Sequence, residues 1–381
     1  MRILICPDKF AGTLSAPEVA AAVAAGWREA APADQIVTRP LADGGPGFVE
    51  VLATAVAGRR IPVRTVDPLG RPADGEILVA GDGTAVTAYV ESAQACGLHL
   101  LAPEERDPKT TTSYGLGVLV AAAVETGARR VVIGLGGSAV NDGGAGMLAA
   151  LGAVPLDAAG RALPYGGAAL VGVASLDGVP RLRDVTLVAA TDVDNPLTGL
   201  HGASNVYGPQ KGATREDVLL LDGALETFAA VLERDLPSCP PGLVGLPGGG
   251  AAGGLGAAIL ALGGRCESGI ELVTRLIGLD AAFDEADLVI TGEGSFDHQS
   301  LRGKVVAGVA GAARDRGLPC VVLAGRVSAG RRESAAAGVT ESFSLVDHFG
   351  GEEHGGVERA MSRPAEGLRA IAARLAPQWS R

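Results

Sequence analysis

The glycine-rich stretch at residues 131–146, VVIGLGGSAVNDGGAG, has the residue types and spacing of an anion-binding loop. It begins with a β-branched apolar run at 131–133, which is typical of a buried strand, and an apolar face begins again at Met147. Glycine-rich turns between a strand and a helix point backbone N–H groups into one concavity, where the helix N-terminus adds partial positive charge. The pattern therefore predicts a phosphate-binding loop, with a tight turn that needs glycine only for steric reasons as the alternative.

Carboxylates occur in this loop and in a second cluster. Asp142 is an acceptor that suits a metal ion or a hydroxyl better than a bare phosphate. The cluster Asp192-Val193-Asp194-Asn195 directly follows an apolar strand expected at 185–190. Alternating carboxylates there could hold Mg²⁺, which prefers oxygen ligands, or accept the proton of a substrate hydroxyl. Turn formation before Pro196 is the alternative explanation.

The net charge of −11 makes the position of each cation informative. The scattered acidic residues argue against a nucleic-acid or anionic-membrane surface, so a site for an anionic substrate must concentrate the few cations locally. The lysines and arginines that lie beside glycine in predicted loops or at a helix start are Lys9, Lys211, Arg302 and Lys304. His298, beside Asp297, is the one histidine in a candidate catalytic loop, and the others show no metal-ligand spacing.

The order of predicted elements indicates an α/β protein of two domains. Residues 1–60 read as β-α-β-α, with a capping box at Ser15–Glu18 opening the first helix, and three further strands are expected at 287–291, 319–324 and 341–346. Five strands are the number in a flavodoxin-like (Rossmann-like) parallel sheet. We therefore predict a flavodoxin-like domain from residues 1–60 and 271–381.

Residues 61–270 form the predicted inserted domain, of mixed α/β topology, because short strands at 61–66, 76–80 and 84–91 are separated by turn sequences. Ligands of open parallel sheets bind outside the carboxyl ends of the strands, which predicts an active cleft between the two domains. The proline- and glycine-rich segment 237–254 is expected to be mobile. The glycine-rich segment 242–256 would allow the domains to close and exclude water.

Several function classes are excluded or made less favourable by the motifs. Gly303-Lys304 is followed by Val305, so there is no Walker A sequence, and no G-x-S-x-G nucleophile elbow occurs. The segment 134–157 resembles a dinucleotide fingerprint, with Asp157 at the acidic position, which keeps an NAD(P)-dependent oxidoreductase as the alternative. A non-enzymatic sensor of nucleotides or sugar acids is a third hypothesis. Phosphoryl transfer remains the favoured chemistry, because it depends on positioning and charge neutralisation.

The cysteines and the apolar runs bear on the compartment. The five cysteines are well separated and form no C-x-x-C pair, which predicts reduced thiols rather than a disulfide framework or zinc site. The first apolar run, 3–6, is too short for a signal sequence, and no run approaches the length of a membrane span. We expect a soluble, cytoplasmic protein with no membrane partner.

Taken together, the loops resemble the bacterial glycerate kinase family. The resemblance covers nearly the whole chain in the same order and is carried by the segments PDKFAGTLS (7–15), ADGGPG (42–47), GGSAVNDGGAG (136–146), DVDNPL (192–197), GPQKGA (208–213) and TGEG (291–294).

The resemblance implies ATP-dependent phosphorylation of D-glycerate with Mg²⁺. We expect direct transfer to give 2-phosphoglycerate rather than the 3-phosphate, and a homodimer is kept open as the assembly. The residues expected to bind the nucleotide are Gly136, Gly137, Ser138, Asn141, Asp142, Gly143, Gly144 and Lys211. The catalytic candidates are Asp192, as the group that orients or deprotonates the hydroxyl, Asp297 and Lys9. The substrate candidates are Asp8, Asp43, Gly44, Arg302 and Lys304, and the metal candidates are Asp194 and Asn195.

Overall fold

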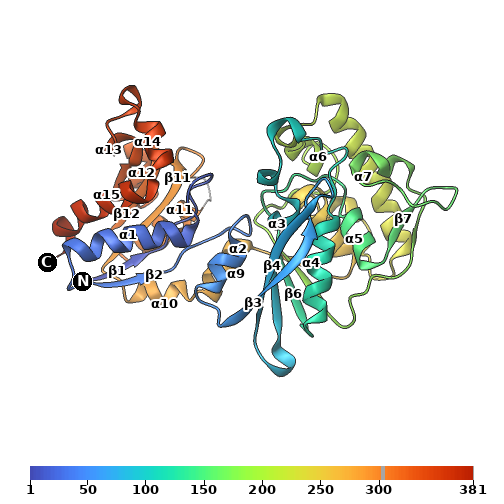
Figure 1. Cartoon of the computed structure of the whole chain (residues 1–381), viewed down its shortest axis with the longest axis horizontal. Coiled ribbons are helices and arrows are strands. Elements are labelled where there is room, and N and C mark those ends of the chain that lie inside the picture. Colours follow the sequence, from blue (N-terminus) through green and yellow to red (C-terminus); the bar gives the residue numbers. More distant parts are fainter. Residues whose placement is uncertain (302–304, 381) are drawn as a thin grey trace. The chain divides into compact units, whose positions relative to one another are not determined.

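The computed structural model describes residues 1–301 and 305–380 and divides into two compact units (Figure 1). Unit 1 comprises Met1–Ala42, Glu50–Val56 and Val273–Arg381, and unit 2 comprises Asp43–Val49 and Ala57–Leu272. The chain thus leaves unit 1, builds unit 2 and returns. The sequence predicted one domain from residues 1–60 and 271–381 and a second from residues 61–270, and these domain bounds stay a prediction.

Unit 1 contains a parallel five-stranded sheet in the order β13-β12-β11-β1-β2. Its strands are β1 (Arg2–Ile5), β2 (Gln35–Thr38), β11 (Leu288–Phe296), β12 (Cys320–Val327) and β13 (Glu341–Ser344). Numbered along unit 1 alone, this order is 2-1-3-4-5, which is the flavodoxin-like order. The fold prediction for this part of the chain is confirmed.

Unit 1 also contains several helices. They are α1 (Ala16–Ala30), α10 (Leu279–Asp284), α11 (Val305–Asp315), α12 (Arg331–Ala336), α13 (Leu345–His348), α14 (Gly356–Ser362) and α15 (Pro364–Trp379), while α2 (Phe48–Ala53) and α9 (Gly269–Leu276) cross between the two units. The capping box of α1 forms as predicted, since the backbone N–H of Ser15 donates to the Glu18 carboxylate at 2.8 Å. Trp27 of α1 is fully buried, and its indole N–H donates to Asp34 at 2.9 Å.

Unit 2 contains a mixed six-stranded sheet in the order β10-β9-β6-β5-β4-β3. Its strands are β3 (Gly58–Val66), β4 (Pro72–Ala80), β5 (Thr87–Glu91), β6 (Arg130–Gly134), β9 (Thr186–Ala190) and β10 (Arg265–Glu267), and β7 (Val154–Leu156) pairs separately with β8 (Ser175–Asp177). The pairs β10·β9, β9·β6 and β6·β5 are parallel, whereas β5·β4 and β4·β3 are antiparallel. The predicted mixed α/β topology is confirmed.

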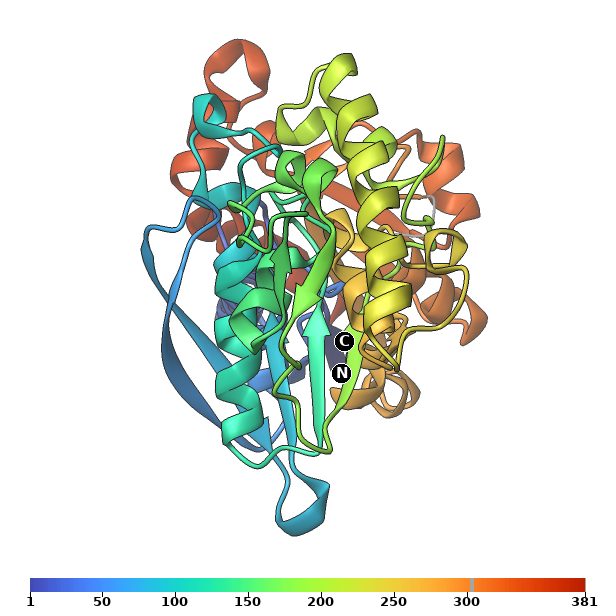
Figure 2. The same cartoon turned by 90° about the vertical axis from the view of Figure 1, so that its right-hand side faces the viewer.

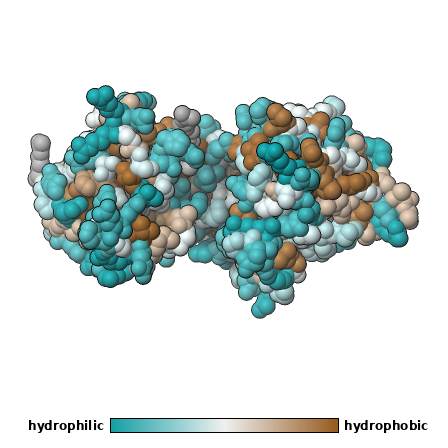
Figure 3. All heavy atoms as spheres, turned by 90° about the horizontal axis from the view of Figure 1, so that it is seen from above, coloured by the Kyte–Doolittle hydropathy of each residue, from teal (hydrophilic) through white to brown (hydrophobic). Residues whose placement is uncertain are grey.

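The helices of unit 2 are α3 (Ala93–Cys96), α4 (Tyr114–Glu125), α5 (Ala145–Leu151), α6 (Ala203–Tyr207), α7 (Arg215–Asp235) and α8 (Leu255–Ala261). Helix α4 lies along one face of the sheet (Figure 2), where Leu116, Leu119 and Val120 are fully buried in the core. None of the described helices is long and apolar enough to cross a bilayer. On the face that Figure 3 shows, hydrophilic residues predominate over unit 1, and hydrophobic residues gather at several places on unit 2.

Two sequence-based expectations differ from the structure. The strand expected at 287–291 is longer in the structure, because residues 292–296 continue β11 and pair with β12 as far as Phe296 and Val327. Gly292 is needed there because an added Cβ would lie 2.0 Å from the carbonyl oxygen of Leu323. The segment 237–254 was expected to be mobile, yet its residues from Gly248 to Ala251 are buried within unit 2.

The contact between α1 and α15 gives a test of packing in unit 1. A Cβ added at Gly26 of α1 would lie 2.0 Å from the carbonyl oxygen of Arg369 in α15. We expect Gly26→Ala to destabilise the protein by about 1–3 kcal/mol through overpacking. Gly308 on α11 is the contrasting position, because a Cβ added there would have no atom within 4 Å among the described residues outside the adjacent helix backbone. Gly308→Ala should therefore stabilise the protein by about 0.5–1 kcal/mol through helix propensity. Urea unfolding measures both, and equal effects of the two substitutions would contradict this packing.

Candidate active site

The predicted loops of unit 2 meet at the carboxyl ends of β6 and β9. These strands are parallel neighbours, with Gly134 opposite Ala190, and the backbone N–H of Leu135 donates to the carbonyl oxygen of Ala190 at 2.9 Å. The glycine-rich loop after β6 therefore leaves the sheet beside Asp192. Two motifs that lie more than forty residues apart in the sequence are brought together by one strand pairing.

The loop at residues 43–47 packs directly on the glycine-rich loop. A Cβ at Gly136 would lie 2.5 Å from the Cα of Gly45, and a Cβ at Gly44 would lie 2.7 Å from the carbonyl oxygen of Ala190. Backbone meets backbone at these points, so any larger residue would push the loops apart. This contact places Asp43 in the same part of unit 2 as Asp192.

The start of the glycine-rich loop lines a cavity of about 130 Å³. Its lining residues are Leu135, Gly136, Gly137, Ser138, Val193, Tyr207, Gln210, Lys211 and Ala252. None of the hydrogen bonds within the described residues uses the backbone N–H of Gly136 or Gly137, so both remain available to a ligand. Free N–H groups beside an amine form a site suited to an anion.

Lys211 is the cation of this cavity and is only 2% exposed. Its Nζ donates to Ser138 Oγ at 3.0 Å and to the carbonyl oxygen of Val140 at 2.6 Å. Burial lowers the pKa of Lys211 to about 7, and the nearby Asp142 carboxylate only partly opposes this shift. The amine therefore changes charge close to neutral pH, and a bound anion would favour its protonated form.

The second half of the loop is committed to structure. Asp142 is 1% exposed, and its carboxylate accepts from the backbone N–H and the hydroxyl of Ser113, both at 2.8 Å, and from the N–H groups of Gly144 and Gly146. The N–H of Gly143 donates to Gly253 at 3.0 Å. Burial raises the pKa of Asp142 although these donors oppose it. Of the predicted nucleotide-binding residues, those from 142 to 144 thus hold the loop rather than face the cavity.

Asn141 shares this interior position but leaves one atom without a partner. It is fully buried, and its Nδ2 donates to Ser204 Oγ at 2.9 Å. Its Oδ1 has no hydrogen-bond donor within the part of the chain that the structure describes. Its amide fixes the loop to α6, which carries Tyr207 at its end.

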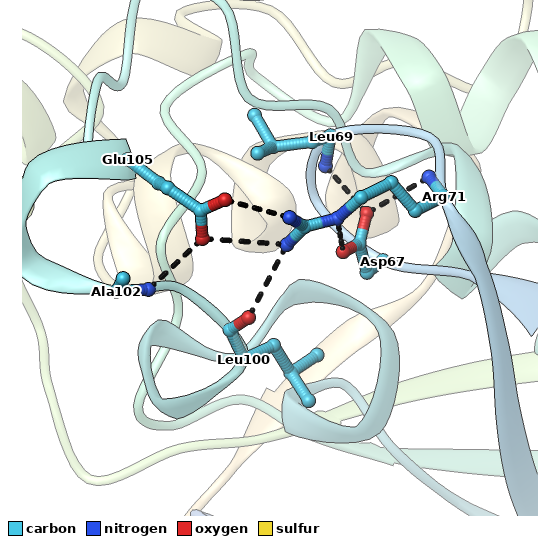
Figure 4. A network of polar contacts seen from close by, with 6 residues as sticks. All are labelled: Asp67, Leu69, Arg71, Leu100, Ala102 and Glu105. Carbon is cyan, nitrogen blue, oxygen red and sulfur yellow. Dashed lines mark hydrogen bonds and ion pairs between the residues drawn. The ribbon is translucent and has the colours of Figure 1, made fainter.

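A polar network supports the segment that binds Asp142 (Figure 4). Arg71 pairs with Asp67 at 2.5 Å and with Glu105 at 2.6 Å, which holds the turn at 67–71. The carbonyl oxygen of Pro68 in this turn accepts from the N–H of Thr112 at 2.8 Å, one residue before Ser113. The network thereby positions the segment that contains Ser113, whose backbone N–H and hydroxyl donate to Asp142 of the glycine-rich loop.

Asp192 combines exposure to solvent with fixed orientation. Its carboxylate accepts from the Ser268 hydroxyl at 2.6 Å and from the N–H of Ile270 at 3.1 Å, at the start of α9. Partial burial raises the pKa of Asp192, and the neighbouring Asp43 carboxylate raises it further. A carboxylate whose pKa lies above its ordinary value is a stronger base and is better suited to accept a proton from a hydroxyl.

The proposed metal residues lie beside the cavity. The Oδ1 of Asn195 accepts from the Tyr207 hydroxyl at 2.7 Å, and its Nδ2 donates to the carbonyl oxygen of His201 at 2.8 Å. Asp194 is exposed. Burial raises the pKa of Tyr207, and the negative charge of Asp194 raises it further. Across residues 1–301 and 305–380, no three His, Cys, Asp or Glu side chains form a group that could hold a metal ion by themselves.

Three further site residues lie in unit 1. Lys9 follows β1, and its Nζ lies 3.8 Å from the Asp8 carboxylate. Asp297 follows β11 and accepts from the N–H groups of Gln299 at 2.7 Å and Ser300 at 3.1 Å, which is the geometry of a turn. Arg302 and Lys304 lie outside the described residues.

Some residues of this site were missed by the sequence analysis. Tyr207 and Gln210 line the anion cavity, and their position just before Lys211 in the sequence was the available signal. Ser268 was not among the predicted site residues, yet its hydroxyl donates to Asp192. Glu91 is 5% exposed at the end of β5 and accepts from the N–H of Val49 at 3.3 Å; no motif pointed to it.

The dinucleotide fingerprint does not have the structure that it requires. The helix that would receive the pyrophosphate, α5, begins only at Ala145, well beyond Gly136. Asp157 lies in a turn, where it accepts from the N–H groups of Ala159 and Arg161. The oxidoreductase alternative therefore has no structural support.

The site combines an anion cavity, made of backbone N–H groups and a lysine, with neighbouring carboxylates. This combination on an α/β fold is typical of a phosphotransferase. Residues 3–380 match the model of the glycerate kinase family. The chain is 42% identical to glycerate 2-kinase from Escherichia coli (strain K12) over 92% of each chain. It is 43% identical to glycerate kinase from Bacillus subtilis (strain 168) over 91% of this chain and 90% of that one. The chain belongs to the glycerate kinase family and is a kinase.

A solved structure agrees with this assignment. The protein from Salmonella typhimurium LT2, assigned by inference as glycerate kinase 2, is similar with a TM-score of 0.80 and 42% sequence identity, and the match covers 99% of this chain and 98% of that chain. The family resemblance and the kinase class expected from the sequence are confirmed.

The lowered pKa of Lys211 predicts a pH-dependent contribution to stability. Between about pH 7 and 10.5, the unfolded chain holds a proton on this amine that the folded chain has lost, so this residue makes the protein more stable as the pH rises. Lys211→Met should remove that contribution. We expect the thermal midpoint of the native protein to rise relative to that of the variant between pH 7 and pH 9.5. Parallel curves over this range would contradict a depressed pKa.

Proposed function

We propose that the protein transfers the γ-phosphoryl group of ATP to a hydroxyl of D-glycerate, and that the product is 2-phosphoglycerate. The observation that carries the proposal is the anion cavity at Gly136, Gly137 and Lys211, which lies in the same unit and at the same sheet edge as Asp192. The family membership supports the substrate. The relative named glycerate 2-kinase, at 42% identity, supports the 2-phosphate over the 3-phosphate.

The anion cavity is proposed to hold phosphate oxygens. The N–H groups of Gly136 and Gly137 would donate to them, and Lys211 would supply positive charge through the Ser138 hydroxyl or directly. Such fixed donors stabilise the charge that develops on the transferring group. Asn141, Asp142, Gly143 and Gly144 would act behind this surface by holding the loop in shape.

Asp192 is proposed to orient or deprotonate the attacking hydroxyl. Its carboxylate is held by two donors, and its raised pKa favours proton acceptance. Asp297 is the second candidate, although its Oδ1 accepts two backbone N–H groups. Asp43 with Gly44 and, from unit 1, Asp8 and Lys9 are proposed to bind the substrates, together with Arg302 and Lys304.

Mg²⁺ is proposed to accompany ATP rather than to occupy a preformed protein cage. Mg²⁺ in kinases is commonly bound through one or two carboxylates, substrate phosphates and water, which fits the absence of a three-residue metal group among the described residues. Asp194 and the Oδ1 of Asn195 are the proposed contributors. The ion would neutralise charge on the phosphates during transfer.

The remaining parts of the proposal concern mechanism and context. Direct in-line transfer requires no phosphorylated enzyme, so exchange of label between ADP and ATP should need the acid. The described cysteines are all free thiols, three of them buried, which supports a reducing compartment such as the cytoplasm. A homodimer remains the assembly to test by light scattering.

A coupled assay of ADP release across small hydroxy acids tests the function. We expect ADP release with Mg·ATP and D-glycerate, a phosphorus NMR spectrum matching 2-phosphoglycerate, and no change in NADH fluorescence on mixing. ADP release that does not depend on D-glycerate would contradict the proposed acceptor. A 3-phosphoglycerate product would overturn only the regiochemistry.

Substitution of Asp192 tests the proposed base. Asp192→Asn keeps the size of the side chain but removes its basicity, and we expect kcat to fall by about 10²–10⁴-fold with an unchanged fold. Asp184→Asn is the matched control, because the Asp184 side chain is almost fully exposed and forms a surface ion pair with Arg129 at 3.6 Å. An Asp192→Asn variant that folds normally and retains near-native kcat would remove this residue as the base.

A further inference from the structure

Unit 1 contains a cavity of its own, of about 400 Å³. It is lined by the segments that follow or end three neighbouring strands: residues 8–13 after β1, residues 293–295 of β11 and residues 325–326 of β12. The remaining wall comes from α13 and α14. All of these segments belong to unit 1.

The cavity occupies the position at which flavodoxin-like sheets bind ligands. In the order 2-1-3-4-5, the direction of strand addition reverses between β1 and β11, and ligands bind outside the carboxyl ends of the strands at this switch point. Gly294 of β11 lets the segment after β1 pass close to this strand, since an added Cβ would lie 3.3 Å from the backbone nitrogen of Ala11. The topology alone therefore marks this cavity as a ligand site.

The chemistry of the lining differs between its two sides. The strand side carries two cations, Lys9 and Arg326, whereas the helix side carries Val346, Val357 and Met361. Val357 is 46% exposed and Met361 is 54% exposed, and they are the exposed large hydrophobic side chains in the described part of unit 1. Exposed apolar side chains gathered in a concave site are typical of a ligand-binding surface.

We infer that this cavity binds the nucleoside part of the phosphoryl donor. The flat faces of a purine base would pack on the side chains of α13 and α14, and the phosphate chain would leave past Lys9 and Arg326. The carboxylates of Asp8 and Glu293, which also line the cavity, are suitable acceptors for ribose hydroxyl groups. The inference rests on the proposed function, because it assigns a place to that reaction's donor.

Glycerate is a poorer occupant of the same cavity. A volume of about 400 Å³ lies within the range of roughly 300–1,000 Å³ that takes ligands much larger than a three-carbon acid. Glycerate is polar over nearly its whole surface, so the apolar wall of α13 and α14 would be left without a partner. A nucleoside has both the size and the apolar faces to fill it.

Filling the cavity tests the inference. Val357→Trp and Met361→Trp place an indole where the base would lie, and both positions are exposed enough for the larger side chain to be accommodated in the folded protein. Val179→Trp in unit 2, at a position that is 79% exposed and outside the anion cavity, is the matched control. The measurements are the dissociation constant of ADP by calorimetry, the KM values for ATP and for D-glycerate, and the thermal midpoint.

We expect each indole in unit 1 to raise the ADP dissociation constant and the KM for ATP by about tenfold or more, with the KM for D-glycerate within about twofold of the native value. The control should leave all three unchanged. Unchanged ADP binding in both folded variants, or a rise in the KM for D-glycerate alone, would overturn the inference.

The same measurements separate this inference from the proposed function. ADP binding that is weakened by Val357→Trp, in a protein that phosphorylates no glycerate, would refute the function but support the nucleoside site. Glycerate turnover with nucleotide affinity that is insensitive to both indoles would refute the site but support the function. A native protein that binds no nucleotide would refute both.

Discussion

The candidate site in unit 2 depends on two stretches of backbone that approach so closely that only glycine fits between them. A Cβ at Gly134 would lie 2.6 Å from the carbonyl oxygen of Gly44, and one at Gly136 would lie 2.5 Å from the Cα of Gly45. The missing side chains let the Asp43 loop reach the end of β6, and the glycine-rich loop that follows β6 presents the free N–H groups of Gly136 and Gly137. Packing and anion binding therefore impose the same residue type at Gly136, and a substitution there would damage both.

The fold could be predicted largely from local patterns. The capping box of α1 and the β-α alternation gave the right elements, and the number of strands was enough to identify the flavodoxin-like sheet. The error at 292–296 has a clear physical origin. Gly292 was interpreted as a loop residue, but glycine is required there by the carbonyl of Leu323 on the neighbouring strand. The pattern of residues along a strand predicts which residues can form it, but it does not show which residues the close approach of a neighbouring strand requires.

The site could be predicted only in part, because burial and hydrogen bonding are tertiary properties. Gly136 and Gly143 look alike in the sequence, yet the N–H of Gly143 donates to Gly253, whereas that of Gly136, which lines the cavity, has no acceptor within the described residues. Asp142 was expected to bind a ligand, which stays a prediction, and its carboxylate accepts from the backbone N–H and the hydroxyl of Ser113. Nothing local distinguishes these cases, since each partner comes from a distant segment.

The charge of the anion cavity follows from the balance between desolvation and attraction at Lys211. Its Nζ donates to the neutral oxygens of Ser138 and Val140, and burial outweighs the attraction of Asp142, so the pKa falls to about 7. An anion that enters the cavity would place a negative charge beside the Lys211 amine and would raise this pKa again. Because linkage is reciprocal, protonation of Lys211 must strengthen anion binding by the same free energy. Binding of an anion in this cavity would therefore be coupled to proton uptake at this buried amine.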